Sequence, residues 1–334
     1  MCCQSRFRWT QDLQLADINV LMQLIKNKTS IDFLSRGRRR VTFAISIFAA
    51  VISLGSIAIE GLEYGIDFTG GVLLEVGYPQ DANLERIRQL LGDAGFADVQ
   101  VQLFGTATDI LLRLPPQLDS DPNEIRNSLR NTLAADEPNV DLRRVEFVGP
   151  QVGQELRERG GLATIFVLLL IFAYVMIRFQ WKFAAGAVAA LAHDVLLTVG
   201  FFSIFGLQFD LTVLAAILAV IGYSLNDTVV TFDRIRENFI KLRGVVPEEV
   251  MNISINEMLA RTIITGVTTL LVLTALFMLG GESVAPFSIA LIIGVIVGTY
   301  SSIYTASATA LYLNVSAQDL LPPVEDPNLV DDMP

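Results

Sequence analysis

The sequence has few of the residues on which disulfide frameworks and metal sites depend. Its two cysteines, Cys2 and Cys3, are adjacent near the N-terminus, so no disulfide framework can hold the rest of the chain together. Its single histidine, His193, excludes a histidine-rich metal site. We therefore expect neither a bound metal nor another cofactor.

Positive charge is also scarce. The 334 residues include 24 Lys and Arg against 35 Asp and Glu, which gives a formal net charge of -11. Proteins that bind nucleic acid present a basic surface to its phosphates, so we expect no nucleic acid among the partners. The N-terminal region also lacks a short apolar core followed by a small-residue cleavage site, and we expect no cleaved signal peptide.

Apolar sequence, in contrast, is abundant. Hydrophobic residues make up 52% of the chain, and its mean hydropathy is +0.51. About 20 consecutive apolar residues cross the hydrocarbon core of a bilayer as a helix. The stretches of this kind are 41–59, 161–177, 183–205, 211–232, 262–279 and 284–313. The sequence therefore predicts a polytopic α-helical membrane protein with six transmembrane helices.

The distribution of positive residues predicts how these helices are oriented. Lys and Arg cluster before the first span and in two connections, at 36–40, 178–182 and 233–261. The short loops on the other side, 206–210 and 280–286, contain neither residue. We predict that both termini are cytoplasmic, with an N-terminal segment at 1–40 and an acidic tail at 314–334.

The connection at 233–261 is both basic and amphipathic. Ile235 and Phe239 share one apolar face, and Pro247 opens a second helical stretch. A helix of this kind lies in the membrane surface with its apolar face toward lipid. We expect the segment to anchor on the inner membrane surface, with membrane lipid as its contact.

Residues 60–159 form a large insertion on the opposite, non-cytoplasmic side. A loop of this length is translocated regardless of its charge. Strand and helix patterns alternate in the insertion: strand 71–78, helix 82–96, strands 99–105 and 109–115, helix 121–133 and strand 140–149. This β-α-β-β-α-β order predicts an α+β domain of the ferredoxin-like kind. Such folds serve many functions, and a simple packing or docking role is an equal alternative.

Two adjacent polar residues, Asn226 and Asp227, interrupt the fourth span. An ionisable residue at membrane depth costs about 2.5–3.5 kcal/mol and indicates a functional site by default. Ser224 and Thr231 share the face of Asp227, which predicts a polar stripe facing the helix bundle. Alternatively, Asp227 belongs to the cytoplasmic interface and is hydrated beside Asp233.

His193 and Asp194 lie near the middle of the third span. Burial favours the neutral form of a carboxyl group, which can then donate a hydrogen bond. Asp194 is therefore consistent with either proton carriage or a structural bond between helices. Because the two residues are neighbours in the sequence, we expect their side chains to point in different directions.

The fifth and sixth spans add further candidates. Arg261 heads a polar stripe that includes Thr265 and is a candidate counter-charge for Asp227. An interfacial arginine whose head group extends toward water is the alternative. In the last span, small residues recur at every fourth position and permit close helix packing: Gly294, Gly298 and Ser302.

Several of these stretches resemble signatures of the SecD/SecF family of protein-export membrane proteins. They are GIDFTGG at 65–71, AHDV at 192–195, VIGYSLNDT at 220–228, FDRIREN at 232–238, RTIIT at 261–265 and YSSIYTAS at 300–307. Together with the predicted spans and the large first loop, the resemblance covers roughly residues 35–315.

The resemblance implies a subunit of the bacterial inner membrane, within the resistance-nodulation-division superfamily, whose large loop is periplasmic. Its implied partners are a SecD-like subunit, the SecYEG channel and the translocating preprotein, and its implied energy source is proton flow. A chain with six spans and one large loop would also be half of a pseudo-symmetric twelve-span assembly, which independently predicts a partner of the same layout.

The resemblance also implies roles for single residues. Asp227 would be the proton-responsive group and Arg261 its partner, and we add Asp194, Asn226 and Thr265 to the candidate proton pathway. A second group stands where the first span meets the large loop. There we infer a hinge or coupling role for Asp67 and the glycine pair Gly70 and Gly71, because paired glycines permit unusual backbone angles.

Functions of three different classes compete with this one. Asp194 and Asp227 would have to share a proton to form an intramembrane aspartyl protease. Neither residue lies in a Gly-x-Gly-Asp setting, so we expect no enzyme. The second competing function is that of a passive assembly subunit, and the third is small-molecule efflux. The sequence also leaves open whether protons or sodium ions are used.

Overall fold

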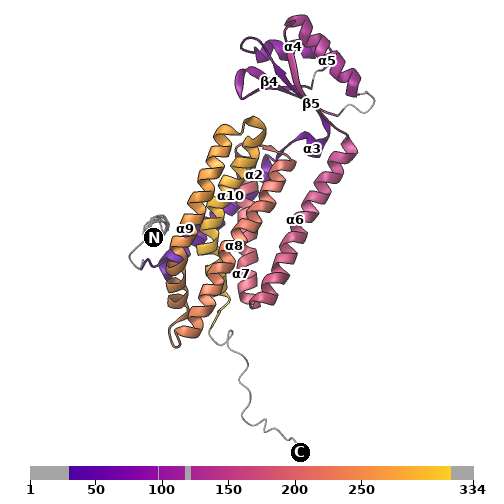
Figure 1. The fold of residues 1–334 in the computed structure, drawn as a ribbon. Helices are drawn as coiled ribbons and strands as arrows, with labels where there is room; N and C mark the ends of the chain where they lie inside the picture. Colours follow the sequence, from indigo (N-terminus) through magenta and orange to yellow (C-terminus); the bar gives the residue numbers. More distant parts are fainter. Residues whose placement is uncertain (1–29, 97, 117–121, 317–334) are drawn as a thin grey trace, which may run out of the picture.

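The computed structural model describes residues 30–96, 98–116 and 122–316. Expectations for Cys2, Cys3 and most of the two terminal segments lie outside these residues. The described chain forms a bundle of long helices that carries a small α+β domain at one end (Figure 1).

Among the described residues, six helical stretches are long and apolar enough to cross a membrane, and the chain is a multi-pass membrane protein as predicted. The first five are single helices, and the sixth is built from four consecutive pieces. They are α2 (Arg36–Ile59), α6 (Pro150–Arg178), α7 (Trp181–Ile204), α8 (Leu211–Lys241), α9 (Pro247–Leu279), and then η1 (Glu282–Val284), α10 (Ala285–Ser301), η2 (Ser302–Ala306) and α11 (Ser307–Tyr312).

Several helices extend well beyond the predicted spans. Helix α6 begins at Pro150 and α9 at Pro247, because proline at the first helical position has no N–H to leave unpaired. Helix α6 descends from the α+β domain along one side of the bundle, whereas α7 and α8 are the most enclosed spans (Figure 1).

The connection at 233–261 differs from its prediction. It forms no separate surface helix, because its residues continue α8 and begin α9. The two helix ends join through a hydrogen bond from Asn238 Nδ2 to Ser254 Oγ (3.0 Å). Ile235 and Phe239 are buried in the protein core, so their apolar face meets neighbouring helices instead of lipid.

The α+β domain has the predicted order of elements. These are β2 (Gly71–Gly77), α4 (Leu84–Asp93), β3 (Gln100–Phe104), β4 (Thr106–Leu114), α5 (Pro122–Asp136) and β5 (Asp141–Val148). The four strands lie in the order β3-β4-β2-β5, and every neighbouring pair is antiparallel. Alternate residues such as Val72 and Leu74 point toward α4 and α5 and form the domain core.

Three short elements at the junction between domain and bundle have no counterpart in the sequence predictions. They are β1 (Glu63–Tyr64), α3 (Ile66–Thr69) and β6 (Gln208–Phe209). Strands β1 and β6 pair in parallel, with Glu63 opposite Gln208. The residues that follow the first span are thereby joined to the loop that precedes α8.

Candidate functional site

Asp227 lies on the enclosed face of α8, in the predicted polar stripe. Ser224, Thr228 and Thr231 are also buried there, and Asp227 itself is 6% exposed. Three polar atoms in this part of α8 have no hydrogen-bond partner within the described chain: Tyr223 Oη, Asp227 Oδ2 and Thr228 Oγ1. Unpaired buried polar atoms are rare in folded proteins, so each of these three calls for a physical explanation.

Arg261 on α9 is the cation that acts electrostatically on Asp227. Helices α8 and α9 pack against each other. Asp227 is buried while Arg261 is exposed, and Asp227 Oδ2 accepts no hydrogen bond within the described chain. Their interaction therefore acts through charge, without a hydrogen bond or ion pair in the described chain.

The other two predicted neighbours are placed differently. Thr265 donates its hydroxyl to the carbonyl of Arg261 (3.0 Å), so its hydrogen bond stays within its own helix. Asn226 is exposed on the face of α8 that points away from the bundle. The structure thus brings Asp227 and Arg261 together and leaves Asn226 outside the group.

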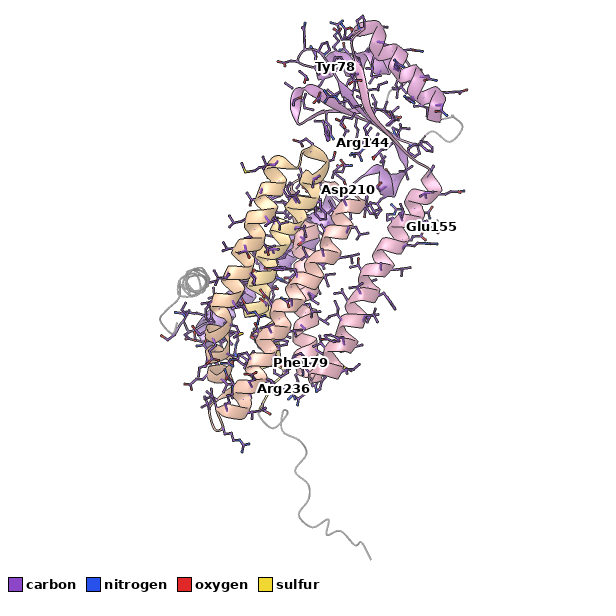
Figure 2. The ribbon with its side chains drawn as sticks, viewed as in Figure 1. Tyr78, Arg144, Glu155, Phe179, Asp210 and Arg236 are labelled. Carbon is purple, nitrogen blue, oxygen red and sulfur yellow. The ribbon has the colours of Figure 1, made fainter. Side chains whose placement is uncertain are left out.

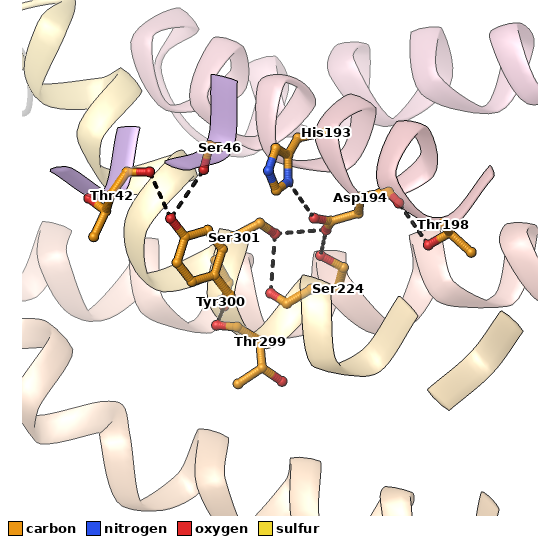
Figure 3. A network of polar contacts seen from close by, with 11 residues as sticks. Thr42, Ser46, His193, Asp194, Thr198, Ser224, Thr299, Tyr300 and Ser301 are labelled. Carbon is orange, nitrogen blue, oxygen red and sulfur yellow. Dashed lines mark hydrogen bonds and ion pairs between the residues drawn. The ribbon is translucent and has the colours of Figure 1, made fainter. Parts of the chain in front are cut away.

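Asp194 is fully buried on α7 and joins three helices (Figure 3). Its Oδ2 accepts hydrogen bonds from Ser224 Oγ of α8 (2.6 Å) and from Ser301 Oγ of α10 (2.8 Å). His193 Nδ1 lies 3.2 Å from its Oδ1, although the adjacent residues were expected to point apart. The histidine ring is oriented back toward the carboxyl group, which corrects that prediction.

The network continues to the first span (Figure 3). The ring of His193 stacks against Tyr300, with 6.3 Å between ring centres. Tyr300 donates its hydroxyl to the Thr42 carbonyl (2.8 Å) and accepts a hydrogen bond from Ser46 (3.2 Å). The roles of Ser46, Tyr300 and Ser301 were not predicted, although two of them lie in the YSSIYTAS stretch.

The two buried carboxyl groups therefore differ in their hydrogen bonding. Asp194 is engaged by groups on three elements, whereas Asp227 has an unused acceptor atom. Within the described chain no hydrogen bond joins one to the other, so the geometry gives no support to a proton-sharing aspartate pair. Asp194 suits a structural bond between helices, and Asp227 suits a change of charge.

The small residues of α10 lie where the helix meets α7 and α8. A Cβ atom on Gly294 would come within 2.2 Å of Val220 Cγ2. A Cβ atom on Gly298 would lie 3.1 Å from Ser224 Cβ and 3.5 Å from Asp194 Oδ2. Ser302 is buried at the start of η2, a single π-helical turn of a kind frequent at functional sites.

Asp67 and the paired glycines lie at the junction. Asp67 Oδ2 accepts a hydrogen bond from the backbone N–H of Leu211, the first residue of α8 (3.0 Å). Gly70 and Gly71 have φ angles of 75° and 129°, in the region that favours glycine. A Cβ on Gly71 would lie only 2.3 Å from the Leu114 carbonyl oxygen, so the backbone leaves no space for a side chain.

Comparison with known proteins places these residues in one family. The model "Protein export membrane protein SecD/SecF, C-terminal" matches residues 128–316, which is more than half of the chain. The chain belongs to the SecD/SecF family. The "SecD/SecF GG Motif" model matches residues 55–82, which contain Asp67, Gly70 and Gly71. The longer SecD/SecF match contains Asp194, Asp227 and Arg261.

Curated relatives carry the name Protein translocase subunit SecF. That of Vibrio alginolyticus is 47% identical over 91% of this chain and 96% of its own length. That of Pseudomonas aeruginosa is 49% identical over 89% of this chain and 96% of its own. This SecD/SecF chain therefore matches these relatives over nearly their whole length.

Solved structures of SecDF are also similar. The crystal structure of SecDF, a translocon-associated membrane protein from Thermus, matches with a TM-score of 0.78 and 37% identity over 86% of this chain. This chain spans only 39% of the length of that protein. A second SecDF structure, in a super-membrane-facing form, matches with a TM-score of 0.64. The two forms therefore differ in how closely they resemble this chain.

Proposed function

We propose that this chain is a membrane subunit of the protein-export machinery that uses the proton gradient to assist preprotein translocation. Asp227 carries the proposal, because its buried carboxyl group has an unused acceptor atom beside the charge of Arg261. When a proton binds, Asp227 loses its charge and no longer attracts Arg261. The helix arrangement that suits the charged form of Asp227 then differs from the one that suits the protonated form.

The proposed orientation places the α+β domain on the periplasmic side of the bacterial inner membrane and both termini in the cytoplasm. The basic residues of the connections and the loops without Lys or Arg support this orientation. We assign the domain to the ferredoxin-like kind, and the antiparallel order β3-β4-β2-β5 supports that assignment. The domain is then available to the preprotein as it leaves SecYEG.

A SecD-like subunit is the proposed partner within the membrane. The SecDF protein to which this chain is similar is much longer than this chain, which leaves room there for a second half. Helix α8 exposes small side chains along the face away from the bundle: Ala215, Ala219 and Gly222, followed by Asn226. Small residues permit close approach of another helix, so this face suits the partner. It also gives Asn226 a role in contact with that partner.

The decisive experiment replaces Asp227 by Asn in membrane vesicles that contain the export machinery. Asn keeps the size of the side chain but cannot change charge. We expect preprotein export to lose its dependence on the proton gradient, while subunit abundance and partner binding stay normal. Asp233→Asn is the matched control, because Asp233 lies on the same helix and pairs with Arg178 (3.2 Å) outside the bundle.

Two further outcomes would identify a different role. Full gradient-dependent export in the Asp227→Asn vesicles would contradict the proton role and favour a passive assembly subunit, a role that the structural bonds of Asp194 also suit. Export that follows an imposed sodium gradient, with no response to a proton gradient, would replace the proton by sodium as the coupling ion.

A further inference from the structure

The start of α8 obtains its hydrogen-bond acceptors from two different parts of the chain. The first N–H groups of any helix lack partners within the helix. Asp210 Oδ1 supplies one acceptor locally, to Val213 N (2.8 Å), and also accepts from the Thr212 hydroxyl (2.6 Å). The acceptor for Leu211 N is Asp67 Oδ2, which belongs to α3 in the segment between the first span and the α+β domain. Both negative groups also favour the positive end of the helix dipole.

Arg113 of the α+β domain acts on this helix end through charge, without a hydrogen bond to it in the described chain. It lies on β4 and is half-buried, and its Nε is enclosed without a hydrogen-bond partner in the described chain. Burial lowers the pKa of the Arg113 guanidinium, and the nearby carboxylates Glu63 and Asp210 oppose that effect. The guanidinium is thus balanced by the same Asp210 that caps α8.

The backbone around these side chains is tightly fitted. Gly65 N donates to the Phe209 carbonyl (2.8 Å), which extends the pairing of β1 with β6 toward Asp210. A Cβ on Gly153 of α6 would lie 2.7 Å from Gly70 N. The junction therefore holds α3, α6 and the start of α8 at fixed positions.

A second attachment of the domain to the bundle is weaker. Arg144 Nη1 of β5 donates to Ser283 Oγ of η1 (3.2 Å), and both groups are exposed. Arg144 lies on the domain and Asp210 on the bundle, on opposite sides of the junction (Figure 2). An exposed hydrogen bond contributes little by itself, and the bond from Leu211 N to Asp67 is exposed as well. The start of α8 differs because the β1–β6 pairing and the close fit of Gly153 against Gly70 accompany that bond.

We propose that Asp67 and Arg113 are positioning residues that clamp the start of α8 to the α+β domain, so that a movement of α8 is passed directly to the domain. Helix α8 is uninterrupted from Leu211 past Asp227, a distance of about 24 Å at the usual helical rise. The assumption that protonation moves α8 rests on the proposed function of Asp227. The clamp itself does not depend on that function.

The clamp is tested by measuring where the domain lies relative to the bundle. Spin labels on the exposed positions Ser128 of α5 and Leu279 of α9 report this distance in the chain bound to its SecD-like partner, after Cys2 and Cys3 are replaced by Ser. We expect Asp67→Ala and Arg113→Gln each to broaden the distance distribution. Asp67→Asn keeps an acceptor oxygen and should broaden it less.

Controls separate the clamp from general loosening. Arg144→Ala removes the weaker attachment and should change the distribution little. Unchanged distributions in both Asp67→Ala and Arg113→Gln would overturn the proposal. If Asp67→Ala does not accumulate in the membrane, Arg113→Gln with Arg113→Lys as its charge-preserving control gives the same test, and an unchanged Arg113→Gln distribution then overturns it.

The transmission step has its own test. We expect Asp227→Asn to shift the domain distance in the otherwise unchanged chain, and the shift to disappear when Asp67→Ala is added. An equal shift with and without Asp67 would contradict the clamp. If Asp227→Asn instead leaves gradient-driven export intact, the proposed function fails, while a broadened distribution in Asp67→Ala would still support the clamp.

Discussion

Asp194 and Asp227 are both carboxylic acids buried among membrane helices, but their neighbours assign them opposite tasks. The two serine hydroxyls and the histidine around Asp194 make its position well determined. Asp227 lacks such partners at Oδ2. A buried group that is fully hydrogen-bonded stabilises one arrangement of helices. A group with an unused hydrogen-bond acceptor can change its protonation state at lower cost.

This difference leads to a prediction for Asp194. The change Asp194→Ala leaves the hydroxyl of Ser224 without its acceptor, whereas Ser301 keeps the Gly298 carbonyl (3.2 Å). An unpaired buried group costs about 1–3 kcal/mol. We expect the purified protein in detergent to unfold at a lower temperature and denaturant concentration. Because the three side chains form one network, a further Ser224→Ala change should add little to the loss.

The opposite result would assign a different role to Asp194. Normal stability of Asp194→Ala, together with loss of gradient-driven export, would show that Asp194 carries protons instead of holding helices together. Thr198→Ala is a suitable control, because Thr198 is also buried on α7 but donates only to the carbonyl of Asp194 (2.8 Å).

At the scale of elements, the contact of α10 with α8 depends on the absence of a side chain at Gly294. A Cβ there would overlap Val220, and forcing an extra carbon into a packed core costs about 1–3 kcal/mol. We expect Gly294→Ala to lower thermal stability and the added Val220→Ala change to restore much of it. Gly55→Ala on α2 is the control, because nothing lies within 4 Å of that position.

An independent effect of the two changes would show that the helices can separate to make space. In that event Val220→Ala would lower stability by the same amount with or without the alanine at position 294. The packing role of Gly294 would then be wrong, because the contact would tolerate a larger side chain.

The sequence predicted the long elements well and the short ones poorly. Twenty apolar residues leave few alternatives to a membrane helix, and period-two strands define the α+β domain. A two-residue strand such as β1 has too few residues to show any period. The apolar face of Ile235 and Phe239 fits a lipid surface as well as a neighbouring helix, and only the three-dimensional structure decides between them.

The sequence indicated some residues of the candidate site and not others. Asp227 and Asp194 stand out because charge is costly at membrane depth. Arg113 does not stand out, because an arginine in a strand of a water-exposed domain is ordinary. Its significance comes from the negative charges of Glu63 and Asp210, which are distant in sequence and act on it only in the folded chain.

For the whole molecule, the proposed partner face of α8 leads to a third prediction. Ala219 is exposed between Ala215 and Gly222 on this face. We expect Ala219→Trp to prevent close approach of the SecD-like subunit and to reduce its co-purification with this chain. Val272→Trp on α9 is the control, since Val272 is 69% exposed on a different helix.

Full co-purification of the Ala219→Trp chain would show that the partner binds elsewhere on the bundle. The same preparation then serves to locate the real interface, because further tryptophan changes on the exposed faces of α2, α6 and α9 test other surfaces of the bundle. Loss of the protein itself would be visible as reduced abundance before any partner is added.

The length of α8 has a final consequence. The helix begins at Leu211, where Asp67 and Asp210 accept hydrogen bonds from its first N–H groups. Its other end lies beside α9, where Arg234 Nε donates to Glu257 (2.6 Å). A helix that moves as one body makes its two ends thermodynamically linked. Any molecule that binds the α8–α9 hairpin and favours one helix position must then alter binding at the α+β domain, and binding at the domain must alter the hairpin by the same factor.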